Sequence, residues 1–384
     1  MSPVPAPAKV LVTGANGYIA AWVVRTLLEQ GYSVRGTVRS ASKGAHLASL
    51  FAEYGDKFEV VVVEDITKEG AFDEAVKGVD LVEHTASPFH FNVKEPEDLI
   101  VPAVRGTTGI LESVKKHGSS VKRVVITSSC ASVLKPSSTP AVWDETSWNE
   151  PAIEEVKEKG APAPAPSIYR ASKTLAEKAA WEFVEKNKDS IAWDLAVLNP
   201  PFVFGPPIHE VASLESLNTS QQELYNTIVL GKKDDAALSA PGSAWIDVRD
   251  LGLAHVLAGQ KAEAGGERII VSAGPYYWQE IVDVANEIQP APIENLPKGV
   301  PGATKGKEYA LNYDTSKAER IFGIKYRSLK EMVNDSLLCH RPPKNNLHIS
   351  IVLTRHHHRT RTTGNATSHR HPSQDIFINT FAED

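Results

Sequence analysis

The sequence predicts an α/β fold in which a doubly wound parallel sheet carries a smaller C-terminal lobe. From the first residues onward, short apolar runs of strand length alternate with longer segments of helical spacing. One run, FEVVVV at 58–63, is continuous and β-branched, as in strands that are covered on both faces. The chain has 384 residues, which is enough for one large unit with such an added lobe.

Strands and helices alternate in order up to residue 200. The expected strands lie at 9–13, 33–38, 58–63, 80–84, 121–127 and 191–198. The expected helices lie at 17–30, 97–117 and about 167–186, where apolar residues recur at helical spacing. Parallel strands need crossover helices between them, so this order predicts one parallel sheet. We assign residues 1–200 to it as a first domain.

The pattern loosens after residue 200. The run NPPFVFGPP at 199–207 interrupts regular structure, and 208–243 and 276–327 have the composition of loops and short helices. We assign 201–340 mostly to the smaller lobe, and we expect segments within about 245–272 to return to the main sheet.

Two segments have a biased composition. Residues 135–166 are rich in proline and end in APAPAP, which is typical of a surface excursion. Residues 341–384 are rich in His, Arg, Thr and Asn with little periodicity, so we expect a disordered tail. Structural zinc sites combine His with Cys or carboxylates at fixed spacing inside an ordered fold, so we expect no metal site in this tail.

The overall composition is that of a globular protein, with 42% hydrophobic and 23% charged residues. The formal net charge of −6 does not favour nucleic acid or an anionic membrane as partner. No stretch approaches the ~20 apolar residues that cross a bilayer, and the first residues lack the features of a secretory signal. Two cysteines, Cys130 and Cys339, give no disulfide framework, so we expect a cytoplasmic protein, either monomer or homodimer.

A glycine-containing turn links the first expected strand to the first expected helix. The sequence TGANGYIA at 13–20 places small residues at a G-x-x-G-x-x-A spacing in that context. Gly14 can take a tight turn, Gly17 lets the backbone approach a pyrophosphate, and the helix start offers unpaired N–H groups to phosphates. We therefore expect pyrophosphate contacts from Gly14, Gly17, Tyr18 and Ile19.

The end of the second strand indicates which dinucleotide binds. NAD enzymes place an Asp or Glu there for the ribose 2′-hydroxyl, whereas this strand ends in Arg39, with Lys43 a turn later and no acid beside them. A guanidinium matches the geometry of a phosphate dianion, which favours NADPH over NADH. After the third strand, Asp65 and Ile66 could flank the adenine, and after the fourth, Thr85 and Ser87 could line the ribose.

A second group of residues has the chemistry of proton transfer. Tyr169 and Lys173 lie four residues apart on a predicted helix and so share one face. A cation beside the phenol stabilises the phenolate and should lower the tyrosine pKa, so the phenol could protonate a carbonyl oxygen. Ser129 follows the fifth strand, where its hydroxyl could donate to that oxygen, whereas we expect Ser128 to face the cofactor side. A Y-x-x-x-K pair alone is common by chance. Its occurrence in order after a phosphate turn, a basic end of the second strand and a serine after the fifth strand is not.

These residues resemble those of the extended short-chain dehydrogenase/reductases, in particular the branch with dihydroflavonol reductases and fungal aldehyde, ketone and methylglyoxal reductases. The similar segments are LVTGANGYIA, GYSVRGTVRS, VKRVVITSSCASV, YRASKTLAEKAAWEF and WIDVRDLGLAHV. The resemblance covers roughly residues 9–338. It implies a Rossmann fold, NADPH as cofactor and a small-molecule carbonyl substrate. It implies Ser129, Tyr169 and Lys173 as the catalytic set, with cofactor contacts at Arg39, Lys43, Asp65, Pro200 and Val203.

One departure from the wider superfamily concerns the helix at 97–117. Gly109 stands where many members place an asparagine that supports a proton relay, which shifts such a relay toward water and backbone.

Two other functions remain open on the sequence. The first is an NAD-retaining nucleotide-sugar epimerase or dehydratase, which usually needs an acid where this chain has Arg39. The second is a regulator that senses NADP without catalysis; such proteins commonly lose the Tyr–Lys pair, which is intact here.

Overall fold

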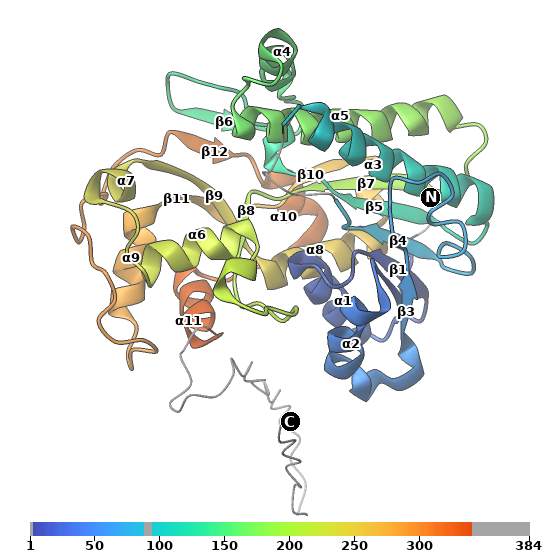
Figure 1. Cartoon of the computed structure of the whole chain (residues 1–384), viewed down its shortest axis with the longest axis horizontal. Helices are drawn as coiled ribbons and strands as arrows, with labels where there is room; N and C mark the ends of the chain where they lie inside the picture. Colours follow the sequence, from blue (N-terminus) through green and yellow to red (C-terminus); the bar gives the residue numbers. More distant parts are fainter. Residues whose placement is uncertain (1–2, 88–93, 340–384) are drawn as a thin grey trace, which may run out of the picture. The chain divides into compact units, whose positions relative to one another are not determined.

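Seven parallel strands form the central sheet of this computed structural model, which describes residues 3–87 and 94–339 (Figure 1). The strand order is β10-β7-β5-β4-β1-β2-β3, and every neighbouring pair runs parallel. The strands are β1 (Lys9–Thr13), β2 (Ser33–Val38), β3 (Phe58–Val62), β4 (Leu81–His84), β5 (Arg123–Thr127), β7 (Asp194–Asn199) and β10 (Arg268–Ile270). The predicted doubly wound parallel sheet is confirmed.

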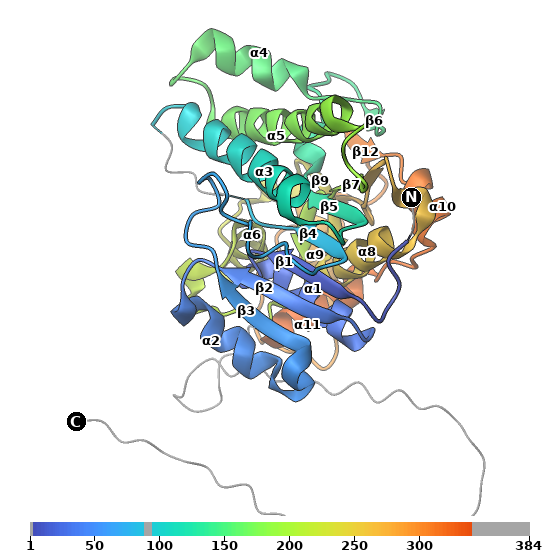
Figure 2. The ribbon, with the colours of Figure 1, turned by 90° about the vertical axis from the view of Figure 1, so that its right-hand side faces the viewer.

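Helices cover both faces of this sheet, as the continuous β-branched strands require. The helices along the chain are α1 (Tyr18–Glu29), α2 (Ala41–Leu50), α3 (Glu97–His117), α4 (Glu150–Lys159), α5 (Ala165–Asn187), α6 (Thr219–Ile228), α7 (Asp235–Ser239), α8 (Val248–Gln260), α9 (Trp278–Glu287), α10 (Ser316–Phe322) and α11 (Leu329–Cys339). Helices α3 and α5 lie on one face of the sheet, and α1 and α8 lie on the other (Figure 2).

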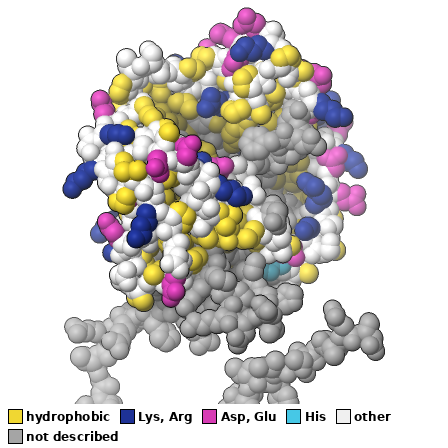
Figure 3. Space-filling model, turned by 60° about the vertical axis from the view of Figure 1, so that its left-hand side comes forward, with side chains coloured by type: hydrophobic (Ala, Val, Ile, Leu, Met, Phe, Trp, Pro, Cys, Tyr) yellow, Lys and Arg dark blue, Asp and Glu magenta, His cyan; other side chains and the backbone are white. Residues whose placement is uncertain are grey.

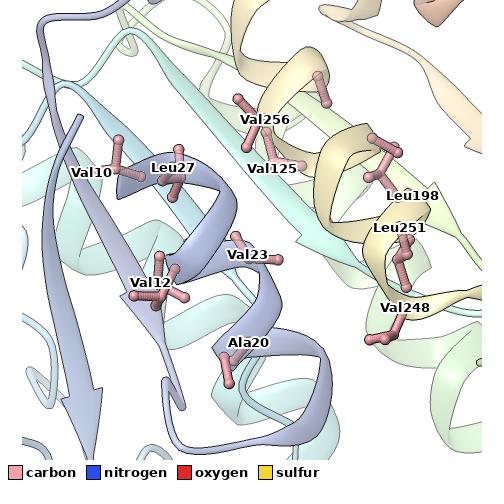
Figure 4. Packing of buried hydrophobic residues seen from close by; sticks show 14 of the residues in the cluster. Val10, Val12, Ala20, Val23, Leu27, Val125, Leu198, Val248, Leu251 and Val256 are labelled. Carbon is pink, nitrogen blue, oxygen red and sulfur yellow. The ribbon is translucent and has the colours of Figure 1, made fainter. Parts of the chain in front are cut away.

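The side chains of the central strands alternate between these two layers. Val12 and Val125 pack against α1 and α8, beside Val23 and Leu251, as Figure 4 shows. Their neighbours Leu11 and Val124 join the cluster that lies under α3 and α5. Because the period of a strand is two residues, this alternation fixes which face each strand residue occupies.

The smaller lobe holds a three-stranded sheet that sequence patterning missed. Its strands are β8 (Phe202–Phe204), β9 (Pro241–Asp247) and β11 (Gly274–Tyr277), in the order β11-β9-β8. The expectation that NPPFVFGPP contains no regular structure is therefore wrong: its prolines flank the strand instead of occupying it, and β8 pairs in parallel with β9. Of the segments expected to return to the main sheet, β10 pairs with β7, while β9 belongs to this separate sheet.

The proline-rich segment at 135–166 contributes to the core, contrary to expectation. Its strand β6 (Ala141–Trp143) pairs with β12 (Leu311–Tyr313), and α4 buries Ile153 and Val156 against α3 and α5. Proline is tolerated in the first turn of a helix, where Pro151 lies in α4 and Pro166 in α5. The division at residue 200 stays a prediction, and the predicted disordered tail lies outside the described residues.

The packing of α4 leads to a first prediction. Ile153→Ala is expected to lower the free energy of unfolding by about 2 kcal/mol, because it removes buried apolar volume and leaves a cavity. Urea denaturation followed by circular dichroism measures this change. Glu154→Ala, at an exposed position of the same helix, should stay within about 0.5 kcal/mol of the wild type. Equal stabilities of the two variants would mean that α4 contributes nothing to the core.

Candidate active site

The predicted site residues follow the carboxyl ends of six parallel strands, so they gather at one edge of the sheet. The order reverses between β1 and β4, whose following helices, α1 and α3, cover opposite faces. In open α/β sheets, ligands bind in the crevice at such a switch point. The residues at this edge are Gly14 and Gly17 after β1, Arg39 after β2, Asp65 and Ile66 after β3, Thr85 and Ser87 after β4, Ser129 after β5, and Pro200 after β7.

The turn after β1 has the shape that a pyrophosphate needs. Gly14 has a φ of 65°, and a Cβ there would lie 3.2 Å from Ala86, so both the conformation and the space favour glycine. The Gly14 amide donates to the Thr37 hydroxyl at 3.1 Å, which fixes the turn against β2. Gly17 caps α1 without any side-chain hydrogen bond, so the first N–H groups of the helix are open to an anion.

The end of β2 presents the two predicted cations. Arg39 and Lys43 are both exposed, and Lys43 lies 3.5 Å from the exposed carboxylate of Glu210. Asp65 accepts two hydrogen bonds from Thr67, which lower its pKa, and the charge of Arg39 lowers it further. An Asp that accepts bonds from its own turn, beside an exposed guanidinium, is poorly suited to hold a ribose diol alone. These residues fit a 2′-phosphate.

The loop after β4 connects the cofactor edge to the catalytic helix. Thr13 on β1 anchors this loop, because its hydroxyl accepts from the amides of Thr85 and Ala86 at 3.2 and 3.0 Å. Ser87 then accepts a hydrogen bond from the Lys173 ammonium at 3.1 Å. Thr85 and Ser87 therefore flank the same edge as Lys173.

The three predicted catalytic residues meet at this edge. Ser129 precedes a short 3-10 helix (Cys130–Ser132), and its oxygen accepts from the Ala131 amide at 3.1 Å. Its hydroxyl also forms a hydrogen bond with the Tyr169 phenol. Tyr169 and Lys173 lie one turn apart on α5, which brings both functional groups to the end of β5.

The pKa of Tyr169 is shifted in the direction opposite to the one expected from the sequence. Burial raises the pKa of Tyr169, and the hydrogen bond from Ser129 lowers it by less. The expected lowering by Lys173 is not found, because the ammonium bonds Ser87 instead. Burial also lowers the pKa of Lys173 to about 8, against an opposing effect of Glu177. Near neutrality the phenol is thus protonated and the lysine charged, as proton donation to a carbonyl requires.

A small cavity of about 20 Å³ lies behind Lys173, between α3, α5 and the sheet. This volume is enough for one water molecule. His84 lines the cavity: its Nδ1 lies 2.9 Å from the Thr13 hydroxyl, and its buried Nε2 has no hydrogen-bond partner among residues 3–87 and 94–339. Burial and the charge of Lys173 lower the pKa of His84 to about 3, so the ring is neutral. From α3 it is Thr107, and not position 109, that lines the cavity; a Cβ at Gly109 would face the Ile66 carbonyl.

Several predicted residues point their side chains away from the edge. The Tyr18 phenol donates to the Gly205 carbonyl at 2.9 Å and accepts from Gln221 at 2.6 Å, so Tyr18 ties α1 to the smaller lobe. Ile19 and Val203 pack with the core under α1 and α8. The side chains of Tyr18 and Val203 are buried, so a cofactor contact of these two residues would come from their backbone, whereas Ile19 is only partly buried. Ser128, expected on the cofactor side, instead donates to the buried Glu177 carboxylate at 2.6 Å.

The sequence analysis overlooked Glu177 and Arg268, which form a buried ion pair behind the site. Glu177 is 2% exposed, and its Oε1 lies 2.5 Å from the Arg268 Nε. A signal was available for the acid, since Tyr169, Lys173 and Glu177 repeat every four residues on one helix face. No local pattern identifies its partner, which is 91 positions away along the chain.

Some other kinds of site have no support in the described part of the chain. Residues 3–87 and 94–339 contain no cluster of His, Cys, Asp and Glu that could hold a metal ion. No helix described there is long and apolar enough to span a membrane. On the face drawn in Figure 3, charged side chains of both signs lie interspersed among hydrophobic ones. The described side chains on that face therefore form no single-sign patch of the kind that nucleic acids bind.

The sheet order, the phosphate turn and the Ser–Tyr–Lys group together define a dinucleotide-binding oxidoreductase of the extended short-chain type. The chain belongs to the NAD dependent epimerase/dehydratase family, whose profile matches residues 10–274. This match confirms the family expected from the sequence.

Individual relatives match over nearly their whole length. Ketoreductase azaE of Aspergillus niger is 40% identical over 86% of this chain and 96% of its own. The NADPH-dependent methylglyoxal reductase GRE2 of Saccharomyces cerevisiae is 40% identical over 85% of this chain and 96% of its own. The crystal structure of yeast methylglyoxal/isovaleraldehyde reductase Gre2 with NADPH has a TM-score of 0.71, at 36% identity, covering 86% of this chain and 98% of that one.

Proposed function

We propose that this chain reduces an aldehyde or a ketone to an alcohol with NADPH. The observation that carries the proposal is the meeting of Ser129, Tyr169 and Lys173 at the sheet edge that also holds the phosphate turn. The relatives support the reaction class, since a ketoreductase and an NADPH-dependent methylglyoxal reductase each match over almost their full length.

Each site residue has its own role in this carbonyl reduction. NADPH supplies the hydride that adds to the carbonyl carbon. The Tyr169 phenol donates its proton to the carbonyl oxygen, while the Ser129 hydroxyl donates a hydrogen bond to the same oxygen as negative charge develops there. In the resting site the Lys173 ammonium bonds Ser87, but once the phenolate forms, this positive charge one turn away on α5 would stabilise it. Lys173, which bonds Ser87 at 3.1 Å, would also bind the nicotinamide ribose.

The direct test is a screen for NADPH consumption with aldehydes, diketones, β-ketoesters and flavanonols, repeated with NADH. We expect at least one carbonyl compound to stimulate NADPH oxidation, and NADH to be the poorer donor. Tight NADPH binding with no stimulation by any carbonyl would favour the sensing regulator instead. Stoichiometric NAD in the purified protein would favour the epimerase or dehydratase.

The two cations after β2 lead to a prediction on cofactor choice. Arg39→Ala is expected to raise the KM for NADPH about 10- to 100-fold, because it removes a charge-assisted contact with the 2′-phosphate. The KM for NADH should change less than about threefold, since NADH lacks that phosphate. Steady-state kinetics with both cofactors measure the ratio.

A matched control is Lys122→Ala, an exposed cation that precedes β5 at the opposite edge of the sheet. Its KM values for both cofactors should equal those of the wild type. If Arg39→Ala weakened NADPH and NADH equally, Arg39 would not select between them.

We also propose that the enzyme is cytoplasmic, because Cys130 and Cys339 are both free.

For the oligomeric state we propose a monomer or a homodimer. Size-exclusion chromatography with light scattering distinguishes these two states, and a larger assembly would contradict both.

A further inference from the structure

Glu177 is a buried carboxylate whose two oxygens are fully engaged, one turn beyond Lys173 on α5. Its Oε2 accepts from the Ser128 hydroxyl at 2.6 Å and from the Asn199 amide at 2.8 Å. The Ser132 hydroxyl also bonds Oε2, at 2.5 Å. Its Oε1 accepts from the Arg268 guanidinium at 2.5 Å. This many donors hold the carboxylate in one position.

The donors to Glu177 surround the catalytic serine. Ser128 and Ser132 lie on either side of the Ser129 turn, and each donates to the same carboxylate oxygen. The Asn199 amide, which bonds Glu177, also donates to the Ser129 carbonyl at 3.3 Å. The carboxylate is therefore the common acceptor that connects the turn after β5 to the end of β7 and to α5.

Arg268 compensates the charge of Glu177 from the other side. Arg268 is 8% exposed, and its guanidinium stacks 3.5 Å from the centre of the Trp148 ring and donates to the carbonyls of Glu145 and Ser147 at 2.6 and 2.9 Å. The ion pair as a whole is neutral. If the carboxylate alone were removed, the guanidinium would be left as an uncompensated positive charge behind the site.

Lys173 and Glu177 both line the small cavity, together with His84. Three other titratable groups near the ion pair and the lysine are uncharged near pH 7, because burial lowers the pKa of His84 and raises the pKa values of Tyr169 and Cys130. The Lys178 ammonium lies 5.3 Å from the centre of the Trp148 ring and pairs with Glu150 at 2.6 Å. The remaining acid nearby, Glu145, accepts from the Ile270 amide on the far side of Arg268. Glu177 is thus the carboxylate that acts on the ammonium.

We propose that Glu177 is a positioning residue of the reduction: it fixes the turn that carries Ser129 and, paired with Arg268, it allows Lys173 to keep its charge inside the protein. This inference rests on the proposed function, because it assumes that Ser129 and Lys173 act in the reaction. The proposal predicts that activity declines at alkaline pH, at a midpoint that depends on the charge of the side chain at position 177. Lys173 loses its proton as the pH rises through about 8. Without the carboxylate, and beside a bare guanidinium, it must lose that proton at a lower pH.

The test compares Glu177→Gln, Glu177→Asp and the exposed control Glu182→Gln, which lies on the same helix with 65% of its side chain exposed. In Glu177→Gln we expect kcat to fall at least about tenfold and the alkaline midpoint of kcat/KM to move down by about half a pH unit or more. The dissociation constant of NADPH, followed by its fluorescence, should change less than about threefold. Glu177→Asp, which keeps the charge, should keep the wild-type midpoint, and Glu182→Gln should match the wild type throughout.

A double variant keeps the test decisive if Glu177→Gln does not fold. Glu177→Gln with Arg268→Met removes both charges, so no uncompensated ion stays buried. Its midpoint should return toward that of the wild type, while kcat stays at least about tenfold low because the Ser129 turn still lacks its acceptor. Wild-type kcat in the double variant, or an unshifted midpoint in a folded Glu177→Gln, would overturn the inference.

Tyr169→Phe is assayed in parallel to separate this inference from the proposed function. If Tyr169→Phe is inactive while Glu177→Gln behaves as the wild type, only the role of Glu177 is refuted. If Tyr169→Phe is fully active, the catalytic assignment itself is refuted.

Discussion

Tyr169→Phe is expected to lose about 10³-fold in kcat/KM for the carbonyl substrate, because it removes the proton donor and leaves the ring in place. Binding of NADPH should be unchanged, since we propose that the turn at Gly14 and Arg39 hold the dinucleotide. Steady-state kinetics and a fluorescence titration with NADPH measure the two quantities. The substitution deletes one oxygen, so circular dichroism should show an unaltered fold.

The pH dependence of the wild type sharpens this expectation. Burial raises the pKa of Tyr169, so the phenol is protonated below and around neutrality and the reduction needs no acidic activation. The alkaline decline in rate should follow Lys173, whose pKa burial lowers to about 8. Tyr54→Phe, at a partly exposed phenol after α2, serves as control and should keep full activity. A Tyr169→Phe enzyme with wild-type turnover would remove the tyrosine from the mechanism.

The sequence predicts the main sheet well because each central strand is buried on both faces. Strands β1 and β5 are such buried strands, and they lie within the predicted 9–13 and 121–127. The run FEVVVV differs: it forms the edge strand β3 (Phe58–Val62), which is only partly buried, and Glu59 has 44% of its side chain exposed, so the expectation that this run is covered on both faces is wrong. The strands of the smaller lobe escape prediction for the opposite reason. Strand β8 has three residues between prolines, and its pairing with β9 depends on chain some 40 positions away, which no local pattern encodes.

The site residues likewise include some that the sequence predicts and some features that it does not. Gly14, Ser129, Tyr169 and Lys173 can be found from the sequence, because each follows a strand or lies on a helix face at a spacing that the chemistry requires. The directions of individual side chains cannot: the Tyr18 phenol turns toward the lobe because the Gly205 carbonyl and Gln221 are there to bond it. A buried ion pair such as Glu177 with Arg268 is set by tertiary contacts alone.

Residues at the amino ends of the central strands, away from the candidate site, should affect the stability of the protein and not its catalysis. Arg123, at the start of β5, is fully buried and makes a bidentate pair with Asp194 at 2.6 and 2.9 Å, and it also donates to the Ala258 carbonyl at 2.7 Å. Asp194→Ala leaves that guanidinium buried without a counter-charge. We expect the free energy of unfolding to fall by about 3–5 kcal/mol, measured by urea denaturation.

The exposed pair of Lys188 and Glu185 provides the comparison, at 2.6 Å but with both side chains more than half exposed. Glu185→Ala should cost less than about 1 kcal/mol, because water already solvates both charges. Replacing the buried pair together, as Arg123→Met with Asp194→Leu, should recover most of the loss, since no unpaired charge is then buried. The kcat of folded Asp194→Ala should equal that of the wild type, because β5 holds Arg123 at one end and leads to Ser129 at the other. A destabilisation no larger than that of Glu185→Ala would mean that water reaches Arg123 in the folded protein.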